Sequence, residues 1–115
     1  MKLLFCICCL NFITTTITAQ TQTSKEMKQY STEIIRYKIP ADKHGEFEKA
    51  YSEAGVFLKQ SPYCKGYQLL HGEEEPNNYI VIIWWTSMQD HLNGFRKSEE
   101  FRSFFNLVKP FFSNI

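Results

Sequence analysis

The sequence predicts an α+β fold, in which an antiparallel sheet carries its helices on one face. Two observations support this prediction. The first is the order of periodic segments along the chain, which runs strand, helix, strand, strand, helix, as in a split β-α-β unit. The second is a short polar loop between the second and third strand segments, which joins them as an antiparallel hairpin.

The first strand is expected over residues 33–39, where apolar and charged residues alternate until Pro40. A helix should follow, capped by Asp42 and ended by Ser61–Pro62. Its apolar residues recur at three- and four-residue spacing and form a stripe that can pack on a sheet: Phe47, Ala50, Tyr51, Ala54, Phe57 and Leu58.

The second and third strands are expected over residues 63–71 and 78–85. We interpret the acidic run Glu73–Glu75 between them as a solvated loop and assign it no site. The third strand is apolar on both faces: Tyr79, Val81, Ile83 and Trp85 form one face, and Ile80, Ile82 and Trp84 form the other. Two helices can cover only one face, so we predict a homodimer in which a second copy covers the other.

A short helix is expected after Ser87, with Asp90 at the capping-box position and Gly94 closing it in a left-handed conformation. Ser98 should cap the last helix, and Pro110 should end it. The apolar stripe of that helix consists of Phe101, Phe104, Phe105, Val108 and either Phe111 or Phe112.

Residues 1–19 are predicted to be an export signal. Lys2 supplies the positive start, and residues 3–13 supply an apolar run interrupted by one asparagine. This run is shorter than the roughly 20 residues that span a membrane, so we expect cleavage after Ala19 and no stable membrane insertion afterwards. The protein should therefore be exported, either to the periplasm or out of the cell. A polar leader, 20–30, should precede one domain, 31–115.

Charge and cysteine content narrow the function further. The 115-residue chain has 13 Lys and Arg against 12 Asp and Glu, so it has no basic field for nucleic acid. Three of the four cysteines lie in the predicted signal, which leaves Cys64 without a partner for an intramolecular disulfide. We interpret Cys64 as a small buried turn residue, with a reactive thiol as the alternative.

The run Trp85-x-Ser87-x-x-Asp90-His91-x-x-Gly94-Phe95-Arg96-x-Ser98 resembles the antibiotic biosynthesis monooxygenase family. The resemblance extends over residues 33–112 and includes these further segments: 47–51, 62–67, Pro76 with Tyr79, Phe101, and Pro110–Phe111. It implies ferredoxin-like subunits that pair sheet to sheet as a dimeric α+β barrel. Family members usually add a fourth strand after the position of Phe112. Its apparent absence leaves three alternatives, namely an exposed sheet edge, a strand from the leader, or a truncated chain.

The resemblance also implies a function, that of a cofactor-independent monooxygenase acting on a quinol-like or polyphenolic aromatic with molecular oxygen. Trp85 would stack on the ring, His91 would remove a proton, and Arg96 would hold the resulting anion. No cofactor is expected. The pocket around the substrate would be lined by Tyr37, Phe57, Tyr67, Phe95 and Phe105.

Each of these residues also has a structural interpretation. Trp85 and the lining aromatics could be core residues, His91 could cap a helix or bond to backbone, and Arg96 could pair with Glu99 or Glu100. The alternative function is a non-catalytic dimeric module that binds a hydrophobic small molecule, either haem or another aromatic.

Haem degradation and metal binding find little support in the sequence. The haem-ligating histidine of the haem-degrading members would fall near Phe104 or Phe105. We interpret His44 and His71 as surface residues, and they show no paired metal-ligand spacing with His91 or Cys64.

Overall fold

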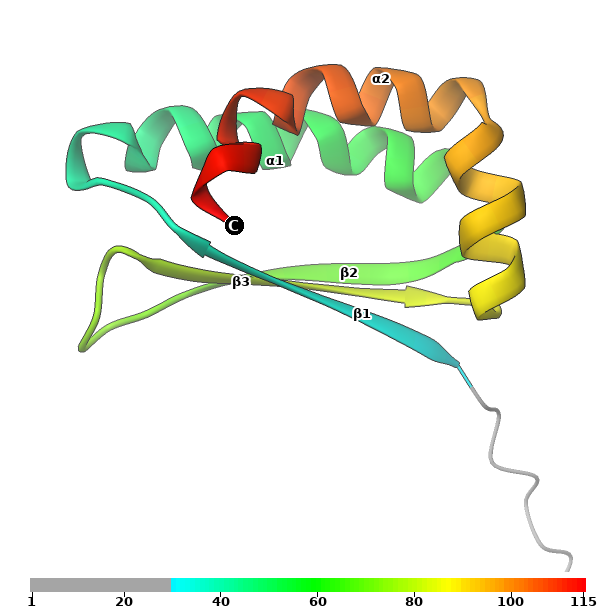
Figure 1. The fold of residues 1–115 in the computed structure, drawn as a ribbon, viewed down its shortest axis with the longest axis horizontal. Helices are drawn as coiled ribbons and strands as arrows, with labels where there is room; N and C mark the ends of the chain where they lie inside the picture. Colours follow the sequence, from blue (N-terminus) through cyan, green and yellow to red (C-terminus); the bar gives the residue numbers. More distant parts are fainter. Residues whose placement is uncertain (1–29) are drawn as a thin grey trace, which may run out of the picture.

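The computed structural model describes residues 30–115, so the predicted signal and nearly all of the predicted leader lie outside the described residues. Its strands are β1 (Ser31–Lys38), β2 (Cys64–His71) and β3 (Asn78–Trp85), and its helices are α1 (His44–Gln60) and α2 (Glu99–Val108). A 3-10 segment, Lys109–Asn114, follows α2. Both helices lie on one face of the sheet (Figure 1), which confirms the α+β prediction.

The sheet is antiparallel throughout, with the strand order β1-β3-β2. The register of β1 on β3 is continuous and runs from Ser31 opposite Trp85 to Lys38 opposite Asn78. The register of β2 shifts between Cys64 and Gly66, where Gly66 has a φ of 154° that other residues rarely adopt. Within residues 30–115 the sheet has three strands, so the outer edge of β1 meets no fourth strand from this part of the chain.

The core lies between the sheet and the two helices. The inward residues of β3 are all buried, and their outward neighbours are half-buried, as the alternating pattern predicted. From the helices the core receives five α1 residues, Phe47, Tyr51, Ala54, Gly55 and Leu58, and two α2 residues, Phe104 and Val108. Gly55 allows close approach, because a Cβ at this position would overlap the Tyr67 ring.

The opposite sheet face carries five apolar side chains among polar ones such as Arg36 and Gln68, and residues 30–115 provide no cover for it. Ile34 and Leu70 are 49% and 43% exposed on this face, and Ile80, Ile82 and Trp84 lie half-buried between them. No helix in the described part of the chain is long and apolar enough to cross a membrane.

Two predictions at helix ends were wrong. Asp42 does not cap α1, because the helix grows out of a 3-10 turn, Ala41–Lys43, whose Lys43 N–H already bonds to Pro40 O at 2.9 Å. Gly94 is not left-handed, since its φ is −95°. Glycine fits here for a different reason, which is that a Cβ would come within 2.6 Å of the Tyr63 ring.

Three other predicted helix-end features were confirmed in whole or in part. Ser98 Oγ accepts a hydrogen bond from Phe101 N–H at 3.2 Å and so caps α2. Ser87 Oγ likewise accepts from Asp90 N–H at 3.0 Å. The Asp90 carboxylate, however, accepts a hydrogen bond from Thr86 Oγ1 at 2.6 Å. Regular helix ends at Val108, just before Pro110, as predicted.

Candidate functional site

A small cavity of about 50 Å³ lies between the sheet and the helices, beside the end of β3. The sheet contributes Glu33, Ile35, Tyr37, Ile83 and Trp85 to its wall, and the helical side contributes Tyr51, His91, Phe95, Arg96, Phe101, Phe104 and Phe112. The wall is mostly aromatic, and its charged groups come from both layers. The cavity therefore combines an apolar interior with a few polar groups, as small-molecule sites usually do.

Glu33 connects the charged groups at one end of the cavity. It lies on the inward face of β1, and its side chain is 24% exposed. The Trp85 Nε1–H donates to Glu33 Oε2 at 3.1 Å, which fixes the plane of the buried indole. Arg96 Nη2 lies 3.9 Å from the other carboxylate oxygen, so the Arg96 ion pair is with Glu33.

His91 stacks flat on Trp85, with ring centroids 4.3 Å apart and an interplanar angle of 6°. Its Nε2 lies 3.3 Å from Glu33 Oε2 and also 3.3 Å from Arg96 Nε, which donates to it. Nε2 can accept the bond from Arg96 only without a proton, and it can donate to Glu33 only with one. The protonation state of His91 therefore selects which of these two partners it binds.

The electrostatic surroundings favour the neutral imidazole. Burial lowers the pKa of His91, the carboxylate of Glu33 raises it, and the cation of Arg96 lowers it, with a net decrease. A histidine with a lowered pKa is free to accept a proton near neutral pH.

The irregular winding after β3 brings His91 and Arg96 together. Residues Asp90–Gly94 form a π-helical turn, and Phe95–Lys97 form a 3-10 turn. The Phe95 N–H bonds to Asp90 O, five residues back, so this turn is wider than an α-helical turn, and it leaves His91 Nε2 and Arg96 Nε 3.3 Å apart. An ordinary α-helical turn would align residues three or four apart and separate this pair.

Two tyrosines form the inner part of the cavity wall. The hydroxyls of Tyr37 on β1 and Tyr51 on α1 lie 2.7 Å apart, and both residues are buried. Burial raises the pKa of both phenols, so both remain protonated.

The structure places five of the eight predicted site residues around this cavity: Trp85, His91, Arg96, Tyr37 and Phe95. The other three do not line it. Tyr67 packs against Gly55 of α1 with Lys59 above its ring, Phe105 packs edge-on against Phe112, and Phe57 lies half-buried at the side of the core.

Glu33 and Tyr51 belong to the cavity but were not predicted to belong to a site. The sequence could have indicated Glu33, because alternate residues of a strand share a face and Glu33 therefore lies on the same inward face as Ile35 and Tyr37. Tyr51 was recognised only as part of a helical stripe, and a stripe does not reveal which of its members face a cavity.

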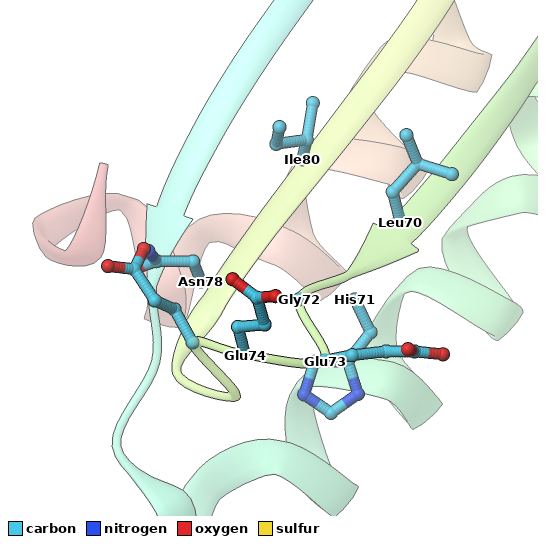
Figure 2. Close-up of a pocket in the computed structure, with 8 residues that line it drawn as sticks. Leu70, His71, Gly72, Glu73, Glu74, Asn78 and Ile80 are labelled. Atoms are coloured by element: carbon cyan, nitrogen blue, oxygen red, sulfur yellow. The ribbon is translucent and has the colours of Figure 1, made fainter.

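Within residues 30–115, the acidic β2–β3 loop and the thiol of Cys64 lie apart from this cavity. A larger and more open hollow of about 470 Å³ lies at the β2–β3 loop. Figure 2 shows the carboxylates of Glu73 and Glu74 pointing in different directions there. Cys64 is half-buried at the start of β2, and burial raises the pKa of its thiol. Among residues 30–115, no group of three or more His, Cys, Asp or Glu side chains is placed to hold a metal ion.

The family described as antibiotic biosynthesis monooxygenase (ABM) matches residues 31–107, well over half of the chain. The chain belongs to this family. The ABM match extends from β1 almost to the end of α2, and every cavity residue except Phe112 lies within it.

Three proteins are similar to this chain in sequence or in fold. The uncharacterized protein YczJ of Bacillus subtilis (strain 168) is 28% identical over 68 residues, which are 59% of this chain and 72% of YczJ. A Bordetella bronchiseptica protein named for the same family has a TM-score of 0.62 at 24% identity, over 70% of this chain and 82% of that one. SnoaB, a cofactor-independent oxygenase from Streptomyces nogalater, has a TM-score of 0.57 at 20% identity, over 69% and 79% of the two chains. These two structural similarities show a shared fold, which does not decide the activity.

Proposed function

We propose that this ABM protein is a cofactor-independent monooxygenase that oxidises a quinol-like or polyphenolic aromatic with molecular oxygen. The observation that carries the proposal is the position of His91 Nε2, 3.3 Å from both a carboxylate and a guanidinium at the edge of an aromatic cavity. This arrangement can remove a phenolic proton and stabilise the anion that results.

The proton transfer follows from the geometry of His91. A neutral imidazole takes the proton of a substrate hydroxyl on Nε2, and Nε2 then loses its bond from Arg96 and donates to Glu33 instead. The Arg96 Nε–H is released by this exchange and can bond to the new phenolate. Trp85 is held by Glu33 and supports the imidazole on its face.

The electron transfer needs only the substrate and oxygen. The deprotonated ring passes one electron to molecular oxygen, and the resulting superoxide and ring radical combine in a carbon–oxygen bond. His91 returns its proton to this peroxide. Water then leaves with the second oxygen atom and the hydrogen of the oxidised carbon, and a new carbonyl remains.

The size of the cavity sets a condition on binding. A volume of about 50 Å³ accommodates a molecule such as oxygen, whereas sites for small organic ligands usually measure about 300 Å³ or more. An aromatic substrate must therefore displace part of the wall. Phe112 is the wall residue best placed to move, because it is 44% exposed and lies in the 3-10 segment after α2.

The predicted homodimer also remains a proposal. The apolar open face of the sheet supports it, since a second copy that presents the same face would bury Ile34, Leu70 and Trp84. We likewise propose export for the chain, on the basis of the sequence of residues 1–19.

Oxygen uptake by the purified protein with a panel of reduced quinols and anthrones tests the proposed activity. We expect uptake above the autoxidation rate, reduced about 100- to 10,000-fold in His91→Ala and strongly reduced in Trp85→Phe. His71→Ala is the matched control, because His71 also stacks on an aromatic ring but lies outside the cavity. Folded protein that consumes no oxygen with any member of the panel, but binds these aromatics, would favour the non-catalytic module instead.

A further inference from the structure

The buried hydroxyl pair of Tyr37 and Tyr51 has one more proton than its hydrogen bonds use. The two residues are only 3% and 1% exposed, and their hydroxyls lie 2.7 Å apart. Each hydroxyl can donate one hydrogen, and the bond between them uses only one of the two. Within residues 30–115, neither hydroxyl has any other hydrogen-bond partner, so one O–H donor is left without an acceptor.

An unused donor at this depth is unusual. Buried polar groups in native proteins nearly always find their partners, and a donor left unpaired destabilises the fold. Burial raises the pKa of both phenols, so the pair does not lose the extra proton by ionising. One of the two hydroxyl hydrogens therefore stays without an acceptor.

The Tyr37–Tyr51 pair lies where its unpaired O–H could bind a ligand. Tyr37 and Tyr51 line the same cavity as His91 and Arg96. Glu33 and Tyr37 mark the two ends on the inward face of β1, four residues and about 13 Å of strand apart. Ile35 lies between them on the same strand, and most of the other wall residues are apolar, among them Ile83 and Phe104. The cavity thus has a base and a cation at one end and a neutral donor at the other.

We propose that the spare O–H of the Tyr37–Tyr51 pair is a binding subsite for an oxygen atom of the aromatic ligand. This inference rests on the proposed function and adds a requirement to it. The ligand carries a hydroxyl that His91 deprotonates and, on the opposite side of the ring, a carbonyl or hydroxyl oxygen that accepts from the tyrosine pair. A phenol with no second oxygen satisfies only one end of the cavity, and a hydrocarbon ring satisfies neither.

Two ligands of matched shape test the subsite. Para-hydroxyacetophenone has a phenol and a ketone at opposite ends of one ring, and para-ethylphenol has the same outline without the ketone oxygen. We would measure both dissociation constants by NMR titration of the Trp85 indole N–H, at a pH where both phenols are neutral. Wild-type protein should bind the ketone about fivefold more tightly, as one hydrogen bond predicts.

The double variant Tyr37→Phe/Tyr51→Phe removes both hydroxyls and should remove this preference, with the affinity for para-ethylphenol retained. Removing both partners at once leaves neither donor nor acceptor unpaired, so the variant should fold. Tyr67→Phe is the control, because its hydroxyl lies outside the cavity and its loss should leave the preference unchanged.

Three results would overturn the proposal, and they differ in what they say of the proposed function. Equal affinities of the wild type for the two ligands would remove the subsite and leave aromatic binding intact, and this test holds even if the double variant does not fold. A preference that persists in the folded double variant would assign the ketone contact to other residues. If neither ligand shifts the Trp85 resonance, aromatic compounds do not enter the cavity, and the proposed function is overturned as well.

Discussion

The two ends of β3 carry similar groups of side chains in different surroundings. At one end, the rings of Tyr79 and His71 stack with centroids 4.2 Å apart and an interplanar angle of 6°. The Tyr79 hydroxyl donates to Glu48 at 2.6 Å. At the other end, the rings of Trp85 and His91 stack with centroids 4.3 Å apart and an interplanar angle of 6°. The Trp85 indole N–H donates to the Glu33 carboxylate at 3.1 Å. Each end thus combines an inward aromatic ring, an imidazole and a carboxylate.

The difference lies in what each imidazole can do. His71 is 42% exposed, and its Nε2 lies 2.6 Å from the backbone carbonyl of Pro76, which ties the ring to the loop. His91 is 12% exposed, and its Nε2 lies between Arg96 and Glu33 instead of a backbone group. The proposed site therefore rests on more than an aromatic–imidazole–carboxylate trio, which both ends have. Enclosure and a cation that competes for the nitrogen distinguish the Trp85 end.

The largest effect that we predict separates the two neighbouring tryptophans of β3. Trp85 is 1% exposed, so Trp85→Ala should lower the free energy of unfolding by about 3–5 kcal/mol, measured by urea denaturation. Trp84 is half-buried on the open face. Trp84→Ala should instead weaken the association of two copies, measured as a lower mass by sedimentation equilibrium. A wild-type protein that sediments as a monomer at high concentration would end the homodimer proposal.

The fold was predictable because its signals are local. β3 was predicted over 78–85 and occupies those residues, since its alternating apolar residues and the polar loop before it are both readable in the sequence. The part of the cavity near Trp85 was also predictable from the sequence, because four of its residues lie within a span of twelve: Trp85, His91, Phe95 and Arg96. A short segment can bring such residues together without information about the rest of the chain.

The rest of the cavity depends on how distant segments pack. Glu33 was not predicted to belong to a site, although it lies on the same inward face of β1 as Ile35 and Tyr37. Tyr51 on α1 meets Tyr37 on β1 only through the packing of the helix on the sheet, and the spacing of an apolar stripe does not reveal that packing. The same limit explains Phe57, which lies on the same helix but at the side of the core.

The second prediction exchanges the charges around His91 and leaves its ring in place. The Glu33 carboxylate raises the pKa of His91 and the Arg96 cation lowers it. Glu33→Gln should therefore lower this pKa, and Arg96→Gln should raise it. NMR titration of the imidazole protons measures both shifts. Because the base must be neutral, the acidic limb of the activity profile should move to lower pH in Glu33→Gln and to higher pH in Arg96→Gln.

Glu48→Gln is the matched control for this prediction, since Glu48 contacts the other stack and lies outside the cavity. It should leave the pKa of His91 unchanged. Shifts of the same sign in Glu33→Gln and Arg96→Gln would contradict the exchange of partners at Nε2, because the two groups then would not act on His91 as opposite charges.

The smallest predicted effect compares one glycine near each stack. A Cβ at Gly45, in the first turn of α1, meets nothing within 4 Å, so Gly45→Ala should stabilise the protein by about 0.5 kcal/mol through backbone entropy. A Cβ at Gly94 would come within 2.6 Å of the Tyr63 ring. Gly94→Ala should therefore cost about 1 kcal/mol, a modest value because Tyr63 is only half-buried and its ring can shift.

Thermal denaturation of both variants measures the difference. The π turn that positions His91 and Arg96 ends at Gly94, so a displaced Tyr63 ring should also disturb the Trp85 end. Gly94→Ala should accordingly lower oxygen uptake while Gly45→Ala leaves it unchanged. Equal stability changes in the two variants would mean that contact with Tyr63 does not hold this turn. The close spacing of His91 and Arg96 would then depend on the winding of residues 90–97 alone.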